Sequence, residues 1–225
     1  MDRWSASDRQ RSAPFSVSDA GPDLDKRRKK QFALRIWSEA SNPVGSVVEF
    51  YLRQHRGLDL LPDVAGHVIR YHESLYVDPQ VRLPGMVCLL RNIETNEPTG
   101  IHRTYLASDT GQKVGRKMLG IAKGAAIKFD FLPVHALTVG EGIETVLSAR
   151  AAGYAPCWAL GSSGAVRNFP VIRDLPELTI LQENDQTSRR DVKVCAKRYL
   201  DARKPVNIIT SNVGNDFNDA WRAMK

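Results

Sequence analysis

The chain of 225 residues is long enough to bury a substantial core, in one large domain or two small ones. Its 42% hydrophobic and 25% charged residues exclude disorder throughout, and no apolar run approaches the roughly 20 residues that span a bilayer. A net charge of +7 and a pI near 9.4 favour polyanionic partners, although many basic proteins have no nucleic-acid function.

Residues 1–29 are rich in Ser, Asp, Arg, Gly and Pro and show no apolar period, so we predict a flexible leader. The charge run over residues 25–30 could contact a nucleic-acid backbone, but the solvated start of a helix is the simpler interpretation. The N-terminus has no apolar segment of the kind that directs secretion. Cysteines are few and widely spaced, which fits buried thiols, and no Cys/His cluster has zinc-site spacing. We therefore expect a cytoplasmic protein with no membrane partner and no zinc.

Residues 30–132 combine a helical start with short strands. Apolar residues recur at helical spacing over residues 29–41, and a second short helix is predicted over residues 47–54. From residue 68 onward the pattern changes to short apolar or alternating runs separated by turn residues, with strands predicted at 68–72, 85–90, 99–106, 117–120 and 126–129. This pattern predicts a small α+β domain built on an antiparallel sheet.

Residues 133–225 alternate strands and helices. Strands are predicted at 134–139, 155–160, 178–182 and 206–210, and helices at 143–152, 189–203 and 218–224. The Gly/Ser segment 161–164 has the composition of a turn, although its backbone N–H groups could also approach a phosphate. Such alternation predicts an α/β fold, with a mostly parallel sheet and helices on both faces.

Acidic side chains follow three of these strands and form three pairs: Glu141 with Glu144, Glu183 with Asp185, and Asp216 with Asp219. The carboxyl ends of parallel strands converge on one crevice, where ligands usually bind. Carboxylates from separate strands repel one another unless a cation lies between them. The pattern therefore indicates a magnesium site that handles phosphate.

Each pair also has a simpler explanation from helix chemistry. Glu141 and Glu144 would complement the positive N-terminal end of the helix that follows them. Asp185 would cap the next helix, which leaves Glu183 unexplained, and Asp216 would cap the closing helix in the same way. Three acidic pairs after three strands are nonetheless much less expected by chance than any one pair alone.

The segment from residue 133 onward resembles a Toprim domain, the catalytic module shared by bacterial-type primases, type IA and type II topoisomerases and certain nucleases. That family pairs a glutamate after its first strand with a D-x-D pair after a later strand, and Glu141 and the Glu-Asn-Asp triplet at 183–185 take these places. The chain is still more similar to the Toprim modules of plasmid, phage and integrative-element primases. This similarity rests on its E-G-I-E-T, E-N-D and N-D-F-N-D segments and on residues 100–106 and 116–120 upstream. It covers about residues 32–225.

The resemblance implies Mg²⁺-dependent phosphoryl or nucleotidyl transfer on nucleic acid, and most directly DNA-primase-like synthesis in the replication or transfer of a mobile element. It makes Glu141 the general acid or base. The implied ligands of Mg²⁺, or of Mn²⁺ as an alternative, are Glu141, Glu183, Asp185, Asp216 and Asp219. Single-stranded DNA and nucleoside triphosphates are the implied partners, and their phosphates would be contacted by Arg103, Arg116 and Lys117, for which solvated surface charge is the alternative.

Two features depart from the family pattern. Glu183 stands where relatives have aspartate, and its side chain is one methylene longer at a metal whose geometry is strict. The chain also has neither zinc ligands nor the GxxxxGK[ST] loop of a helicase, which relatives often carry. We therefore expect a separate helicase or zinc-domain protein as a partner. Two alternatives stay open, a Toprim-type nuclease and a non-catalytic DNA-binding accessory subunit.

Overall fold

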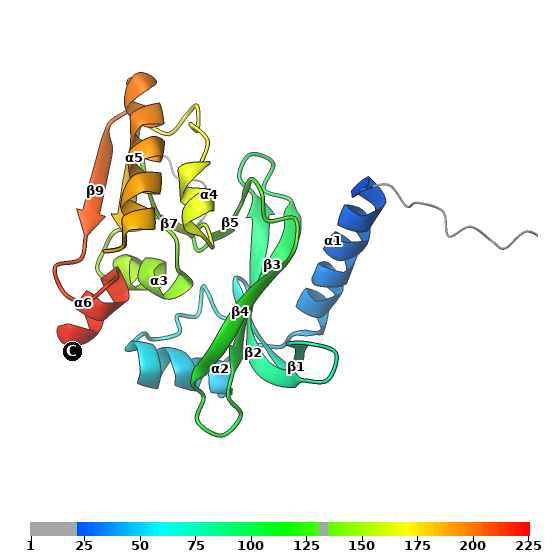
Figure 1. Ribbon diagram of the computed structural model, residues 1–225. Helices are drawn as coiled ribbons and strands as arrows, with labels where there is room; N and C mark the ends of the chain where they lie inside the picture. The colour runs from blue at the N-terminus through cyan, green and yellow to red at the C-terminus, as the bar shows by residue number, and fades with distance from the viewer. Residues whose placement is uncertain (1–21, 131–134) are drawn as a thin grey trace, which may run out of the picture.

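The computed structural model describes residues 22–130 and 135–225 and contains a nine-stranded sheet flanked by helices (Figure 1). The main path of paired strands runs in the order β4-β3-β2-β5-β7-β6-β8-β9, and β1 pairs with β2. The strands are β1 (Ile69–Tyr76), β2 (Arg82–Asn92), β3 (Pro98–Leu106), β4 (Lys113–Gly120), β5 (Ala125–Lys128), β6 (Ala136–Gly140), β7 (Cys157–Ala159), β8 (Glu177–Gln182) and β9 (Val206–Thr210). The helices are α1 (Pro22–Glu39), α2 (Val47–Phe50), the π-helical turn η1 (Tyr51–His55), α3 (Ile143–Ala151), α4 (Ser163–Arg167), α5 (Gln186–Asp201) and α6 (Phe217–Ala223). Within the described ranges, none of these helices has the length and apolar character needed to cross a membrane.

Helix α1 begins earlier than the sequence pattern predicts. Residues 22–29, expected to belong to the leader, are helical, and the rest of the expected leader, residues 1–21, lies outside the described residues. The charged residues pair one turn apart, as Lys29 with Asp25 at 2.7 Å, so the charge run supports a helix. Further along, α1 packs on the antiparallel strands through the buried side chains of Ala33 and Ile36, and Ala40 just after the helix joins them.

Strands β1 to β5 pair antiparallel, as predicted. The middle of β2 is buried on both faces. Side chains of α1 pack against Val87 and Leu89 on one face, while side chains of α2 and η1 pack against Met86, Cys88 and Leu90 on the other. This two-sided burial explains why the strand has an apolar run rather than an alternating pattern.

Strands β6 to β9 are parallel, and the expected α/β architecture is confirmed. Helices α3 and α6 lie side by side on one face, and α4 and α5 lie on the other (Figure 1). The predicted turn at residues 161–164 instead leads into α4, which the sequence pattern misses because the helix has only five residues. The Ser162 hydroxyl caps α4 by accepting the N–H of Ala165.

Strand β5 joins the antiparallel and parallel parts of the sheet, since it pairs with β2 on one side and β7 on the other. A buried apolar cluster crosses this junction and contains side chains of η1, β2, β5 and α3. The boundary between two domains at residue 132 stays a prediction.

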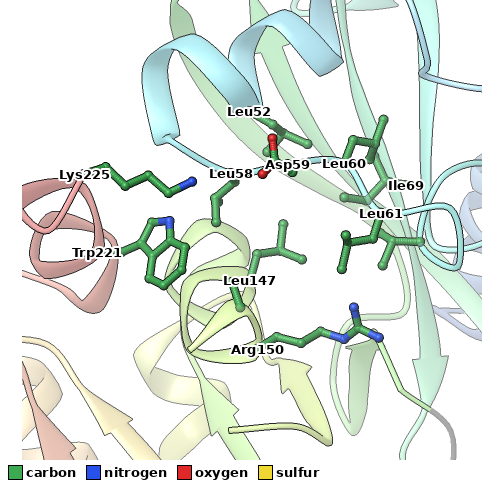
Figure 2. A pocket seen from close by; sticks show the side chains of 12 residues that line it. Leu52, Leu58, Asp59, Leu60, Leu61, Ile69, Leu147, Arg150, Trp221 and Lys225 are labelled. Atoms are coloured by element: carbon green, nitrogen blue, oxygen red, sulfur yellow. The ribbon is translucent and has the colours of Figure 1, made fainter. Parts of the chain in front are cut away.

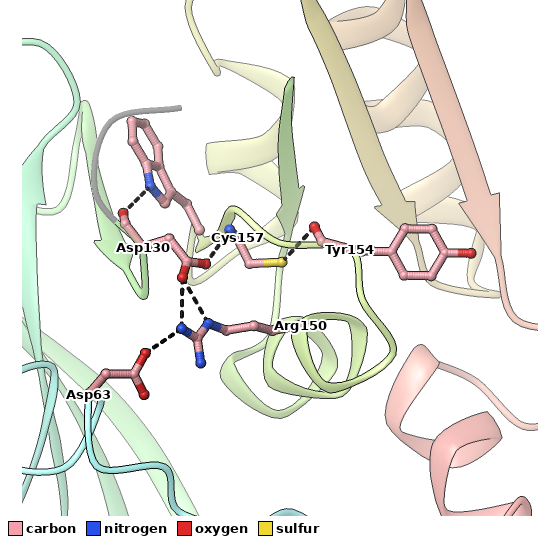
Figure 3. Close-up of polar contacts among 6 residues, drawn as sticks. Asp63, Asp130, Arg150, Tyr154 and Cys157 are labelled. Carbon is pink, nitrogen blue, oxygen red and sulfur yellow. Dashed lines mark hydrogen bonds and ion pairs between the residues drawn. The ribbon is translucent and has the colours of Figure 1, made fainter. Parts of the chain in front are cut away.

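Arg150 of α3 also connects the two parts of the sheet, through ion pairs with Asp130 and Asp63 (Figure 3). Its Nε and Nη2 donate to Oδ1 of Asp130 at 2.9 and 2.8 Å, and Nη2 also donates to Asp63 at 2.5 Å. Asp130 in turn accepts the backbone N–H of Cys157 at 2.8 Å. Because the Arg150 side chain is only 13% exposed, its pair with Asp130 is partly shielded from water, whereas Asp63 is 57% exposed.

Replacing Asp130 with alanine is expected to lower the free energy of unfolding by about 2 kcal/mol, because it leaves a partly buried guanidinium and a backbone N–H without their acceptor. Asp63→Ala is the matched control and should cost less than about 1 kcal/mol, because its ion pair is exposed. Urea unfolding of both variants measures the difference, and equal losses would contradict this account of the junction.

Candidate functional site

The end of β6 places Glu141. The strand ends at Gly140, where an added Cβ would lie 2.9 Å from Val146 and 3.2 Å from Leu181. Glycine therefore lets β6 pack closely against α3 and β8. The chain then turns directly into Glu141, whose side chain is 16% exposed.

Asp185 and Asp216 each cap a helix. Oδ1 of Asp185 accepts the N–H of Ser188 at 2.8 Å at the start of α5, and Oδ1 of Asp216 accepts the N–H of Asp219 at 3.0 Å at the start of α6. The simpler explanation from helix chemistry thus holds for both residues. In the described parts of the chain no hydrogen bond reaches Oδ2 of either carboxylate, so capping leaves each a second oxygen for a ligand.

The side chain of Asp219 holds the backbone of the loop that contains Asp216. Its Oδ2 accepts the N–H groups of Asn215 at 2.7 Å and of Asp216 at 3.4 Å, which completes a capping box. This oxygen is therefore engaged with the backbone.

Asn184 connects two of the acidic loops, a role that the sequence pattern does not predict. Its Nδ2 donates to the backbone oxygens of Ser211 at 2.8 Å and Gly214 at 2.9 Å, and its N–H donates to the backbone oxygen of Asn215 at 2.8 Å. The end of β8 is thereby held against the loop before α6. The only sequence signal for this residue is its place in the middle of the Glu-Asn-Asp triplet.

The acids gather at the ends of the adjacent parallel strands β6, β8 and β9, and this gathering affects the pKa of Glu183. Burial raises this pKa, and the charges of Glu141, Asp216 and Asp185 raise it further, to about 7, against a smaller opposing effect of Arg116. Four carboxylates from three loops therefore lie near one another. Across the residues that the structure describes, no three His, Cys, Asp or Glu side chains are grouped closely enough to hold a metal ion. A bound cation would have to draw these carboxylates together.

The three basic residues of β3 and β4 lie on two faces of the sheet. Nη2 of Arg116 lies 3.2 Å from Oε1 of Glu141. Arg103 and Lys117 pair across the strands and face away from the acids, donating at 3.3 and 2.8 Å to the backbone oxygens of Tyr76 and Val77. Neighbouring residues of a strand point to opposite faces, so Arg116 and Lys117 cannot share one. Of these three, Arg116 alone reaches the acids.

Glu144 does not join the carboxylates at the sheet edge. It is 7% exposed, and its Oε1 accepts hydrogen bonds from Tyr51 Oη at 2.5 Å and Lys113 Nζ at 2.8 Å. Because Lys113 and Arg116 are both on β4, this edge strand contacts both glutamates of the segment 140–145. No sequence signal indicates Tyr51 or Lys113, since each meets Glu144 only through the fold.

An apolar pocket of about 470 Å³ lies between α3, α6 and the segment after η1 (Figure 2). Its walls include Leu52, Leu58, Leu147 and Trp221. None of the four crowded carboxylates lines it, so this pocket is separate from the acidic site.

Two family models match the chain. The model of the Toprim domain matches residues 136–224, and a model described as a domain of unknown function (DUF7146) matches residues 27–129. No curated protein matches the chain.

Several solved primase structures are similar to this one. The primase fragment of the bacteriophage T7 primase-helicase protein is 16% identical with a TM-score of 0.51, covering 76% of this chain and 64% of its own. A DNA primase domain from Pseudomonas aeruginosa is 12% identical with a TM-score of 0.59, covering 86% and 74%. The zinc-binding and RNA polymerase domains of the Aquifex aeolicus primase are 15% identical with a TM-score of 0.58, covering 88% and 58%. At such identities the likeness shows the fold, and the chain spans less than two thirds of the phage and Aquifex structures.

Replacing Glu183 with glutamine is expected to stabilise the metal-free protein increasingly as the pH rises. The pKa of Glu183 in the folded protein, about 7, lies above its ordinary value of 4.5, so its contribution to stability is greatest below pH 4.5 and is lost as the pH rises through 7. Wild type and variant should differ little near pH 4.5, and the wild type should be less stable by about 1 kcal/mol near pH 8, with solvent screening allowed for.

Urea unfolding in a chelating buffer, measured from about pH 5 to pH 8, gives this difference. Glu94→Gln, in an exposed turn, is the control and should show no such trend. A stability gain for Glu183→Gln that does not change with pH would contradict the crowding of the acids.

Proposed function

Because residues 136–224 are a Toprim domain within a primase-like fold, we propose that the chain is a Mg²⁺-dependent nucleotidyltransferase that synthesises oligonucleotides on a single-stranded DNA template. The observation that carries this proposal is that Glu141, Glu183, Asp185 and Asp216 follow the adjacent parallel strands β6, β8 and β9. Asn184 joins two of these loops, and Arg116 lies 3.2 Å from Glu141. Repelling carboxylates next to a guanidinium suit a substrate that brings phosphate together with a divalent cation.

The donor atoms of this cluster are carboxylate oxygens, which suit Mg²⁺, or Mn²⁺ as an alternative. Glu183 and Asp185 would be the main ligands, Asp216 would assist, and Glu141 would join them or act in proton transfer. A bound divalent ion would neutralise charge on the phosphate and make the attacking hydroxyl more acidic. Asp219 is a weaker ligand because its Oδ2 holds two backbone N–H groups, and we assign it the support of Asp216.

Glu141 and Arg116 would have different roles in the reaction. In nucleotidyl transfer the 3′-hydroxyl oxygen bonds to the α-phosphorus while the bond to pyrophosphate breaks. Glu141 would accept the hydroxyl proton, and Arg116 would exchange its contact with Glu141 for one with the nucleotide phosphates. Arg116 is suited to that exchange because 42% of its side chain is exposed.

The partners of the chain follow from the same proposal. Nucleoside triphosphates would bind beside Arg116, and single-stranded DNA would run over the basic strands, where the exposed Lys117 would contact it outside the acidic cluster. Arg103 is only 8% exposed and would support this surface rather than touch the DNA. A separate helicase or zinc-domain protein would supply the functions that relatives carry on additional domains. We propose the cytoplasm as the location and replication or transfer of a mobile element as the process.

A second candidate is a non-catalytic DNA-binding accessory subunit of a primase or helicase system. It is favoured by Glu183 in place of the family's aspartate and by the lack, in the described ranges, of three acidic side chains arranged to hold a metal. A Toprim-type nuclease would use the same carboxylates to cleave a phosphodiester. The assay for synthesis separates these three activities.

Glu141→Gln and Asp185→Asn are expected to lower Mg²⁺-dependent oligonucleotide synthesis on a single-stranded template by about 10²–10⁴-fold, because each removes a charge from the reacting centre. Binding of the template, measured by fluorescence anisotropy, should change little. Synthesis by the variants at the wild-type rate would exclude this site. Inert wild type and variants that bind DNA alike would instead support the accessory subunit, and cleavage of the template that the variants lose would support the nuclease.

Arg116→Ala is expected to raise the KM for the nucleoside triphosphate about tenfold or more, because the charge that meets its phosphates is removed. At saturating template, Lys117→Ala is the matched control for nucleotide binding, since its side chain is at the neighbouring position of β4 but faces away from the acids. Steady-state kinetics of both variants test this assignment, and equal KM values would contradict it.

A further inference from the structure

A buried polar network lies beneath the acidic cluster. Tyr51 is fully buried, and its hydroxyl donates to Oε1 of Glu144 at 2.5 Å. The same hydroxyl accepts a hydrogen bond from Nε of Arg56 at 2.9 Å. Lys113 donates to the same carboxylate oxygen from the other side, at 2.8 Å.

The network continues into α6 and returns to α3. Nδ2 of Asn218 donates to the backbone oxygen of Arg56 at 2.9 Å and to Oγ of Ser148 at 2.9 Å. Oγ of Ser148 donates to the backbone oxygen of Glu144 at 2.8 Å. These contacts form a closed circuit through η1, α3 and α6.

The circuit reaches two of the three helices that begin at acids of the cluster, α3 and α6, but not α5. Glu144 is in the first turn of α3, three residues after Glu141, and Asn218 is in the first turn of α6, two residues after Asp216. Tyr51 opens the π-helical turn η1, a type of turn that often marks functional positions. Through these contacts η1 and the residue after it support the acidic loops that precede α3 and α6.

Near neutral pH the Glu144 carboxylate stays ionised and the Tyr51 hydroxyl stays protonated. Burial alone would raise the pKa of Glu144, but Lys113 and the hydroxyl of Tyr51 hold that pKa well below its usual range. Burial and the charge of Glu144 raise the pKa of Tyr51, so its hydroxyl keeps its proton. A buried carboxylate needs its donors in place, which makes the spacing between η1 and α3 hard to change.

We propose that Tyr51 is a positioning residue, which through Glu144, Arg56 and Asn218 sets the spacing between Glu141 and Asp216 and so the affinity of the carboxylate cluster for a divalent cation. Tyr51 touches neither metal nor substrate in this role. The inference rests on the proposed function only in taking the cluster as a cation site. It extends that function by assigning control of the cluster to η1.

The test compares Tyr51→Phe with Tyr199→Phe in the full chain. Tyr199 is also fully buried, and its hydroxyl likewise makes two hydrogen bonds, to the backbone oxygen of Pro170 at 2.8 Å and from the N–H of Ile172 at 3.3 Å. It lies in the apolar cluster on the other face of the parallel strands, so its replacement removes a buried hydroxyl without touching the circuit.

Binding of Mn²⁺, followed by electron paramagnetic resonance and calorimetry, is the first measurement. Tyr51→Phe should weaken Mn²⁺ binding about 10-fold or more, the usual effect of removing a supporting residue around a metal site. Tyr199→Phe should bind Mn²⁺ as the wild type does, although both variants lose stability. Wild-type affinity in Tyr51→Phe, or equal weakening in both variants, would overturn the proposal.

Hydrogen exchange of the metal-free protein is the second measurement and does not depend on the proposed function. Tyr51→Phe should speed exchange together in the segments around residues 141–146 and 214–219, and Tyr199→Phe in neither. If the wild type binds no Mn²⁺, the proposed function fails, while the exchange result still decides whether Tyr51 couples the two loops. Unchanged exchange in Tyr51→Phe would overturn the coupling.

Ser148→Ala provides a milder variant in case Tyr51→Phe does not fold. It removes only the hydroxyl that joins Asn218 to Glu144. A smaller loss of Mn²⁺ affinity, with faster exchange in the same two segments, is expected. Wild-type behaviour in both measurements would contradict the circuit.

Discussion

Mutual repulsion of carboxylates is the constraint that shapes the acidic end of the parallel sheet. Burial and three neighbouring negative charges raise the pKa of Glu183 to about 7, so the folded chain holds the cluster at a cost in stability. Local contacts offset part of that cost, since Asp185 and Asp216 each accept a backbone N–H at the positive end of a helix and Arg116 neutralises Glu141. Capping and ligand binding are therefore compatible roles for these acids.

The antiparallel part of the sheet also supplies two basic side chains that contact the glutamates after β6. β4 is its edge strand, several strands away from β6 along the sheet, yet Lys113 and Arg116 of β4 contact Glu144 and Glu141 at the end of β6. The fold therefore brings this edge strand close to the acidic loops. In the contact between Lys113 and Glu144 both side chains are largely buried, which suits a fixed structural support. In the contact between Arg116 and Glu141 the arginine is 42% exposed, which suits a contact that can be exchanged for one with a ligand.

Most of the fold could be predicted from the sequence because the period of apolar residues reports which faces are buried. The parallel strands, their helices and the antiparallel sheet all follow from such patterns, and each is confirmed. The exceptions have local causes. Helix α1 begins within a charge run that has no apolar period, and α4 has too few residues for a period to show.

The sequence by itself determined the α/β class, the Toprim resemblance and the acids that follow three of the strands, because these depend on residue order and on local hydrogen bonding. Only the tertiary structure decided which charges meet. It turned Arg116 toward Glu141 and Arg103 and Lys117 away, and it buried Glu144 against Tyr51, 93 residues earlier in the chain. These contacts depend on the pleat of β4 and on how the antiparallel strands pack against the parallel part of the chain. The pleat puts Arg116 and Lys117 on opposite faces, but which face meets the acids leaves no trace in the spacing of residues, since contacts between distant segments are set by packing.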